Sequence, residues 1–165
     1  MQTLSKGTTI KYEGEQGIWL TGTSTSSQIT SLTENKIGAG PELPLGINCH
    51  CMLRLNSTTV AVLAGFEVSP WRNNNKMWYY HVQDDQWVEG PSLKVGRRWA
   101  GCGTFEYGDS TYILVVGGTD AEAGKSVEML NIRGNAWVDG KKIIFVFCNP
   151  GRYLYTLYYI ISFSP

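Results

Sequence analysis

Short apolar runs that end in glycine recur along the chain. These runs lie at residues 17–22, 60–65 and 112–118. Each consists mostly of β-prone residues, and each is followed by a polar stretch rich in turn-forming residues. Because the runs are short and bounded by glycine, they predict buried β-strands, and no segment carries a long helical period. The pattern therefore indicates an all-β chain.

Two further strands accompany each apolar run. One follows the polar stretch, and its three copies are at residues 28–32, 76–82 and 126–132. Another leads into the run, most clearly at residues 49–55 and 101–107. This leading strand ends in a predicted turn, at Asn56 and Ser57 in one copy and at Gly108 and Asp109 in the next.

A fourth strand completes each copy and ends at a glycine, and these glycines recur at a constant interval. These glycines are Gly40, Gly90 and Gly140, separated by 50 residues. Trp87 and Trp137 each stand three residues before such a glycine, and the first copy lacks the tryptophan. The repeated unit is thus four antiparallel strands in about 50 residues, the size of one propeller blade. The predicted blades cover residues 8–44, 47–94 and 98–140, and their apolar runs are expected to be buried on both faces, as when blades stack.

Residues 141–165 do not continue the repeat. They lack the Pro-x-Leu element that follows Gly40 and Gly90, and they contain no second strand that ends in glycine. The β-prone run at 153–161 either pairs as a strand on an open blade or belongs to a non-native end of a truncated chain. The second interpretation is favoured.

Composition limits the classes of function. The chain of 165 residues has 17% charged residues, against about 25% in an average soluble domain, and its net charge is zero. Without a strong positive field, nucleic acid and anionic membranes are not expected partners. No run reaches the ~20 apolar residues of a membrane span, and residues 1–12 are too polar to form a signal peptide.

The cysteines and histidines do not match a metal-binding pattern. Cys49 and Cys51 flank His50, but the chain has only one other histidine, His81, and no Cys-x-x-Cys pair. One intervening residue places Cys49 and Cys51 on one face of a strand, with His50 on the other. No metal or other cofactor is therefore expected, and the thiols are expected to be buried without a chemical role.

One N-glycosylation sequon is present, formed by Asn56, Ser57 and Thr58. Such a sequon matters only if the chain is secreted. Short sequons also arise by chance, so the motif alone does not decide the compartment.

These landmarks together resemble the kelch repeat family. The family's glycine doublet after an apolar run appears as Gly117 and Gly118, whereas the first two copies keep a single glycine. Its tyrosine and tryptophan, seven positions apart, appear as Tyr80 and Trp87. The similarity covers about residues 8–140, and it rests on three copies in a fixed order.

The resemblance implies a partial β-propeller of about three four-stranded antiparallel kelch blades. Kelch domains usually close with about six blades, and three blades cannot form a closed ring. Unpaired edges and apolar faces would remain at the two ends. The chain is therefore expected to be a fragment, whose missing blades come from the full-length protein or from association.

The resemblance also implies a protein-binding role without catalysis, as a kelch scaffold or as the substrate-recognition adaptor of a ubiquitin ligase, in the cytoplasm. In kelch substrate adaptors, an arginine just before the first strand of a blade lines the mouth of the central channel. Arg98 looks like that residue, with Arg97 beside it. Because arginine grips carboxylates through paired hydrogen bonds, the expected partner is a protein or an acidic peptide. Trp71 and Arg72, in the longest loop, form a second predicted contact pair.

Two alternatives stay open. One is a propeller enzyme such as a copper oxidase, for which His50 and His81 would be the only histidine ligands. The other is an extracellular adhesion or glycan-binding propeller. Asp84 and Asp85 are interpreted as residues of a solvated turn and not as an acid–base pair. Arg98 also has a plain interpretation, as a surface residue that caps a loop.

Overall fold

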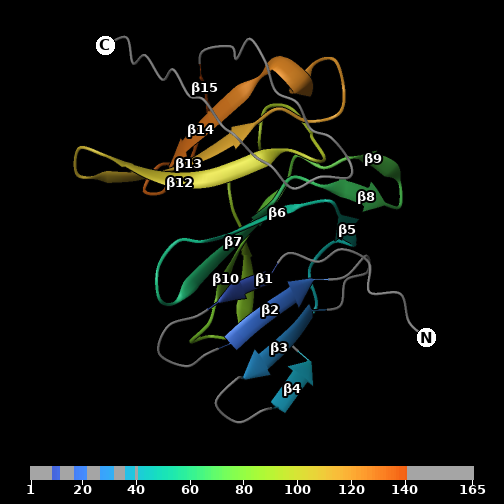
Figure 1. Cartoon of the computed structure of the whole chain (residues 1–165), viewed down its shortest axis with the longest axis vertical. Helices are drawn as coiled ribbons and strands as arrows, with labels where there is room; N and C mark the ends of the chain where they lie inside the picture. The colour runs from blue at the N-terminus through green and yellow to red at the C-terminus, as the bar shows by residue number, and fades with distance from the viewer. Residues whose placement is uncertain (1–8, 12–16, 22–26, 32–35, 40, 141–165) are drawn as a thin grey trace.

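The chain is an all-β structure in the residues that the computed structural model describes (Figure 1). Those residues are 9–11, 17–21, 27–31, 36–39 and 41–140. Apart from one 3-10 turn, η1 (Ala123–Lys125), every regular element among them is a β-strand. The all-β prediction is therefore confirmed. The predicted tail at 141–165 lies outside the described residues.

Three four-stranded antiparallel sheets follow one another along the chain. The first contains β1 (Thr9–Lys11), β2 (Gly17–Thr21), β3 (Ser27–Ser31) and β4 (Lys36–Ala39). The second contains β6 (Cys51–Arg54), β7 (Thr59–Leu63), β10 (Met77–His81) and β11 (Gln86–Glu89). The third contains β12 (Gly101–Tyr107), β13 (Ser110–Val116), β14 (Val127–Asn131) and β15 (Val138–Asp139). Within each sheet the strands lie in chain order, and none of the three sheets closes on itself.

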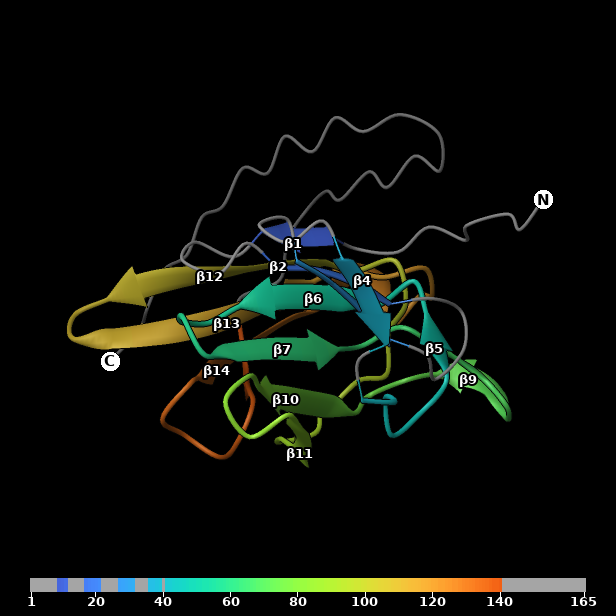
Figure 2. The same cartoon turned by 90° about the horizontal axis from the view of Figure 1, so that it is seen from below.

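A hairpin inserted between β7 and β10 pairs with a short strand that precedes β6, and the three strands form a small sheet. It consists of β5 (Ile47–Asn48), β8 (Phe66–Val68) and β9 (Trp71–Asn73), with β8 in the middle. The sequence predicts a loop around Trp71 and Arg72, so the hairpin of β8 and β9 is a correction. Strands of two or three residues are too short for their alternation to stand out from a polar loop. Figures 1 and 2 show this hairpin at one end of the larger sheets.

Two consecutive residues with positive φ follow the second strand of each later sheet. They are Ala64 (φ 59°) and Gly65 (φ 100°) after β7, and Gly117 (φ 69°) and Gly118 (φ 147°) after β13. A Cβ on Gly65 would lie 2.7 Å from the main-chain oxygen of Asn48, and one on Gly118 would lie 2.8 Å from the Cβ of Ala123. Glycine is therefore needed where the chain leaves the apolar strand.

The main apolar core lies between the second and third sheets. It contains Cys51, Ala61, Leu63, Met77, Leu93, Ile113, Val115, Leu130 and Trp137. On the other face of the second sheet, a separate cluster contains Leu43, Ile47, Met52, Val60, Val62, Trp78 and Tyr80. Because alternate residues of β7 enter the two clusters, this strand is buried on both faces, as its uninterrupted apolar sequence predicts.

Trp87 and Trp137 make the same contact in consecutive copies of the repeat. Trp87 Nε1 donates to the main-chain oxygen of Pro41 at 3.1 Å, and Trp137 Nε1 donates to that of Pro91 at 2.8 Å. In both cases the acceptor stands 46 residues earlier, just after the closing glycine of the preceding copy. Each ring is thereby fixed against the preceding repeat, so both tryptophans have a structural role.

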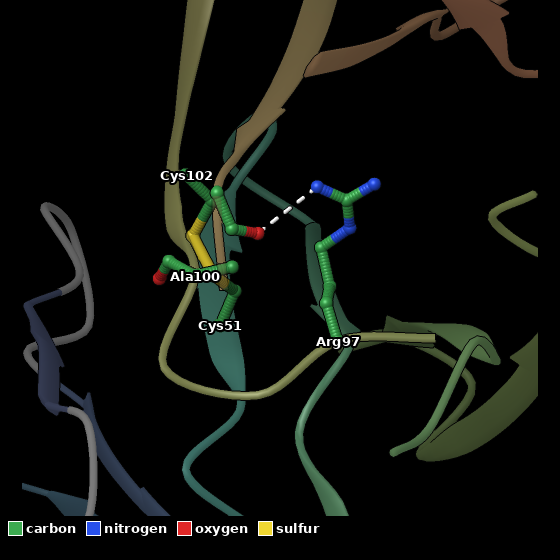
Figure 3. The surroundings of a disulfide bond; sticks show 5 residues. Cys51, Arg97, Ala100 and Cys102 are labelled. Carbon is green, nitrogen blue, oxygen red and sulfur yellow. Dashed lines mark hydrogen bonds between the residues drawn. A yellow bond between two sulfur atoms is a disulfide. The ribbon is translucent and has the colours of Figure 1, made fainter. Parts of the chain in front are cut away.

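The first strands of the three large sheets are neighbours, and a disulfide joins two of them. β6 lies beside both β1 and β12 (Figure 2). Cys51 in β6 and Cys102 in β12 form a disulfide, with their Cα atoms 6.2 Å apart (Figure 3). The expectation that the thiols around His50 have no chemical role is wrong for Cys51, which is bonded to Cys102. Cys49 lies outside the disulfide, and Cys148 lies outside the described residues.

Candidate functional site

Arg98 stacks on the hairpin of the preceding copy. Its guanidinium carbon lies 4.4 Å from the centroid of the Phe66 ring in β8, which is a cation–π contact. Its Nε donates to Oγ1 of Thr119, in the loop after β13, at 3.1 Å. Among the described residues, no carboxylate forms an ion pair with Arg98. The positive charge is thus held in place by two contacts without being neutralised.

Trp71 projects from the same hairpin. Trp71 is 82% exposed. Its ring and the Phe66 ring form an edge-to-face contact, with centroids 6.0 Å apart and ring planes at 89°. The adjacent Arg72 side chain is 64% exposed and donates through Nε to the buried carboxylate of Glu67 at 2.6 Å. We call Phe66, Trp71, Arg72 and Arg98 the aromatic–arginine surface.

Two consecutive copies of the repeat build this surface together. Asn73, at the end of β9, donates through its amide to the carboxylate of Asp120 in the loop after β13. Asp120 also accepts from the main-chain N–H of Ala123 at 2.6 Å. The main-chain N–H of Gly65 donates to the carbonyl of Arg97 at 2.7 Å. The hairpin and the loops are therefore fixed relative to one another. This lowers the entropic cost of ordering the surface when a partner binds.

Arg97 does not belong to this surface, although the sequence predicts it as a partner contact. Its side chain is 0% exposed and forms an ion pair with Glu128, which is 1% exposed. Its Nη1 donates to the main-chain oxygen of Gly117 at 3.0 Å (Figure 3). The Glu128 carboxylate also accepts from the main-chain N–H groups of Lys94, at 2.7 Å, and Val95, at 3.2 Å. Because these bonds use the guanidinium inside the fold, Arg97 is a structural residue.

The groups considered for catalysis are scattered over the fold. His50 lies directly before β6, and burial lowers its pKa to about 4, so its imidazole is neutral at physiological pH. His81 is the last residue of β10. Asp84 and Asp85 lie in the turn between β10 and β11, as predicted. Over the described ranges, no group of three or more His, Cys, Asp or Glu side chains is arranged to hold a metal ion.

Sequence reasoning missed Phe66 and Thr119, the two residues that hold Arg98. No local pattern marks them, because Phe66 meets Arg98 through the packing of one copy on the next, and Thr119 is 21 residues away in the same copy. The disulfide, in contrast, could have been predicted from the spacing of its cysteines. Cys51 and Cys102 are 51 residues apart, close to the repeat length, so both fall on the first strand of their copies. The structure brings these two first strands together.

No family model matches this chain, and a search of curated proteins finds no match to it. Within the part of the chain that the structure describes, no helix combines the length and the hydropathy that a membrane crossing requires.

Proposed function

We propose that the chain consists of consecutive kelch-type propeller blades and serves as a scaffold for protein binding, without catalysis. Three four-stranded antiparallel sheets in chain order, with their first strands next to one another, support this proposal. The two tryptophan–proline hydrogen bonds that recur at the same spacing add further support, because they join each copy to the one before.

Three blades leave a propeller ring open. We propose that the missing blades are supplied by the full-length protein or by association with another chain. Either arrangement would cover the apolar faces and strand edges that an open array leaves at its two ends.

The proposed partner is a protein segment that presents a carboxylate beside an apolar side chain. One observation carries this proposal: the uncompensated guanidinium of Arg98 is stacked on Phe66, which in turn meets the exposed Trp71 ring. A fixed arginine binds carboxylates through charge-assisted hydrogen bonds, and exposed tryptophan is enriched among residues that dominate binding energy. Arg72 contributes less charge, because Glu67 already neutralises it.

The disulfide favours a scaffold outside the cell. Disulfides persist in oxidising compartments and are rare in the cytosol. The sequence favours the cytoplasm and a ubiquitin-ligase adaptor, and the bond between Cys51 and Cys102 is the observation against both. The extracellular adhesion alternative, with a protein ligand, becomes our preferred setting.

Replacing Arg98 by alanine is expected to weaken binding of an acidic peptide by at least about tenfold, since a hydrogen bond to a charged group is worth about 1.5–3 kcal/mol. Binding peptides would be selected on an array of Asp- and Glu-containing sequences, each beside its Asn or Gln counterpart. Fluorescence anisotropy then gives the dissociation constant for the unchanged protein and for Arg98→Ala.

Arg133→Ala is the matched control, because Arg133 is exposed in the turn after β14. Asn131 at that end of β14 pairs with Tyr112, at the opposite end of β13 from Thr119. The control is expected to bind as the unchanged protein does. Equal affinity of Arg98→Ala and the unchanged protein for the selected peptides would sink the proposal.

A further inference from the structure

The glycosylation sequon occupies an exposed tight turn. Asn56 and Ser57 are exposed and connect β6 to β7. The end of β6 and the start of β7 lie side by side here, since Arg54 pairs with Val60. An acceptor asparagine must enter the active site of a transferase, and a protruding hairpin turn allows this without unfolding of the sheet.

The side chains of the sequon already have a defined arrangement. Oδ1 of Asn56 accepts from the main-chain N–H of Thr58 at 2.8 Å and from its Oγ1 at 3.1 Å. The Thr58 hydroxyl, which the sequon requires, is therefore next to the Asn56 amide group. None of the hydrogen bonds in the described part of the chain uses Nδ2 of Asn56, the atom to which the glycan is joined.

The disulfide is an independent observation that leads to the same compartment. Its two cysteines lie on β6 and β12, and neither belongs to the sequon. N-linked glycosylation takes place where secreted proteins fold and where disulfides form. We propose that this domain matures in the secretory pathway and that Asn56 carries an N-linked glycan.

The transfer would use a lipid-linked oligosaccharide pyrophosphate as co-substrate. Nδ2 of Asn56 forms a bond to the anomeric carbon of the first sugar, while the bond from that carbon to the pyrophosphate oxygen breaks. The lipid pyrophosphate leaves with the electron pair, and the transferase takes the proton lost from Nδ2. No oxidation or reduction is involved.

A glycan at this position leaves the aromatic–arginine surface open. β7 begins near Asn56 and ends at Leu63, three residues before Phe66, so the two sites lie at opposite ends of the same strand. Figures 1 and 2 both show the β6–β7 turn at the left and the β8–β9 hairpin at the right.

The test is secretion of the full chain from animal cells behind a cleavable signal peptide. We expect one discrete mass step that a peptide N-glycosidase removes, with conversion of Asn56 to aspartate in the released peptide. Asn56→Gln and Thr58→Ala are expected to lose the step. Ser57→Ala and Thr58→Ser are expected to keep it, because both retain the sequon. A secreted, unmodified chain would overturn the proposal.

The same peptide from the native protein decides whether the modification occurs in the cells that make it. Glycan on Asn56, with Cys51 and Cys102 resistant to alkylation before reduction, is the expected result. An unmodified Asn56, or two free thiols, would overturn the proposal. The peptide-binding test on Arg98 is made on separate variants, so failure of the glycan proposal leaves the proposed binding role to its own test.

Discussion

Arg97→Met is expected to lower the free energy of unfolding by about 3–5 kcal/mol, the loss typical when one member of a buried ion pair is removed. The substitution keeps an unbranched, flexible side chain but removes the counter-charge of the Glu128 carboxylate in a site that is 1% exposed. Main-chain oxygens of Gly117 and Ser126 lose a donor at the same time. Urea unfolding followed by tryptophan fluorescence measures the change.

The preceding copy shows how the fold manages without this ion pair. Fifty residues before Arg97 and Glu128 stand Ile47 and Trp78, which belong to one apolar cluster. The place of Lys94, whose N–H bonds to Glu128, is taken by Pro44, which has no N–H to satisfy. At these positions one copy thus has a buried ion pair with its hydrogen bonds, and the preceding copy has apolar residues.

Rescue by a second substitution distinguishes the ion pair from simple loss of packing. Arg97→Met combined with Glu128→Gln removes the buried charge and keeps an acceptor for the N–H groups of Lys94 and Val95. We expect the double variant to recover more than half of the lost stability. Strictly additive losses from the two single variants would contradict the assignment, because they would mean that the charges do not interact.

Removing the disulfide is expected to lower the free energy of unfolding by about 4 kcal/mol, from the loop-closure entropy of a cross-link between residues some 50 positions apart. The bond joins the first strands of two consecutive sheets, so it restricts the unfolded chain over one complete repeat. Cys51→Ala combined with Cys102→Ala is the suitable variant. Its urea midpoint would be compared with that of the unchanged protein.

Reductant provides the internal control for this measurement. It should lower the midpoint of the unchanged protein and leave that of the double alanine variant where it is. Cys49→Ala should keep the reductant response, because Cys49 lies outside the disulfide. A double variant as stable as the oxidised protein would show that the bond adds nothing to the folded state.

The all-β class could be predicted from the sequence because short local patterns mark the strands of each repeat. Glycines at a spacing of 50 residues mark where strands end, and uninterrupted apolar runs such as β7 mark strands buried on both faces. Trp87 and Trp137 are recognisable for the same reason, since each stands at the same distance from its closing glycine. The hairpin of β8 and β9 is different, because its three-residue strands carry too short a pattern.

The candidate site is only partly predictable, because it depends on contacts between copies. Arg97 and Arg98 are adjacent in the sequence, yet one is buried against Glu128 and the other stacks on Phe66. Nothing in the pair itself distinguishes them. What distinguishes them is the identity of their partners, 31 residues away in the first case and in the preceding copy in the second. Trp71 and Arg72 are predictable as exposed residues, but the Glu67 carboxylate that binds Arg72 is not.

The claim that each repeat is fixed against the one before is tested most directly by hydrogen exchange of the tryptophan indole N–H groups, assigned by single Trp→Phe variants in nuclear magnetic resonance spectra. Trp87 and Trp137 donate to Pro41 and Pro91, so both should exchange at least about a hundredfold more slowly than the exposed Trp71. Protection of both indoles is the result that stacked, equivalent copies require. Exchange of either indole as fast as that of Trp71 would contradict the account.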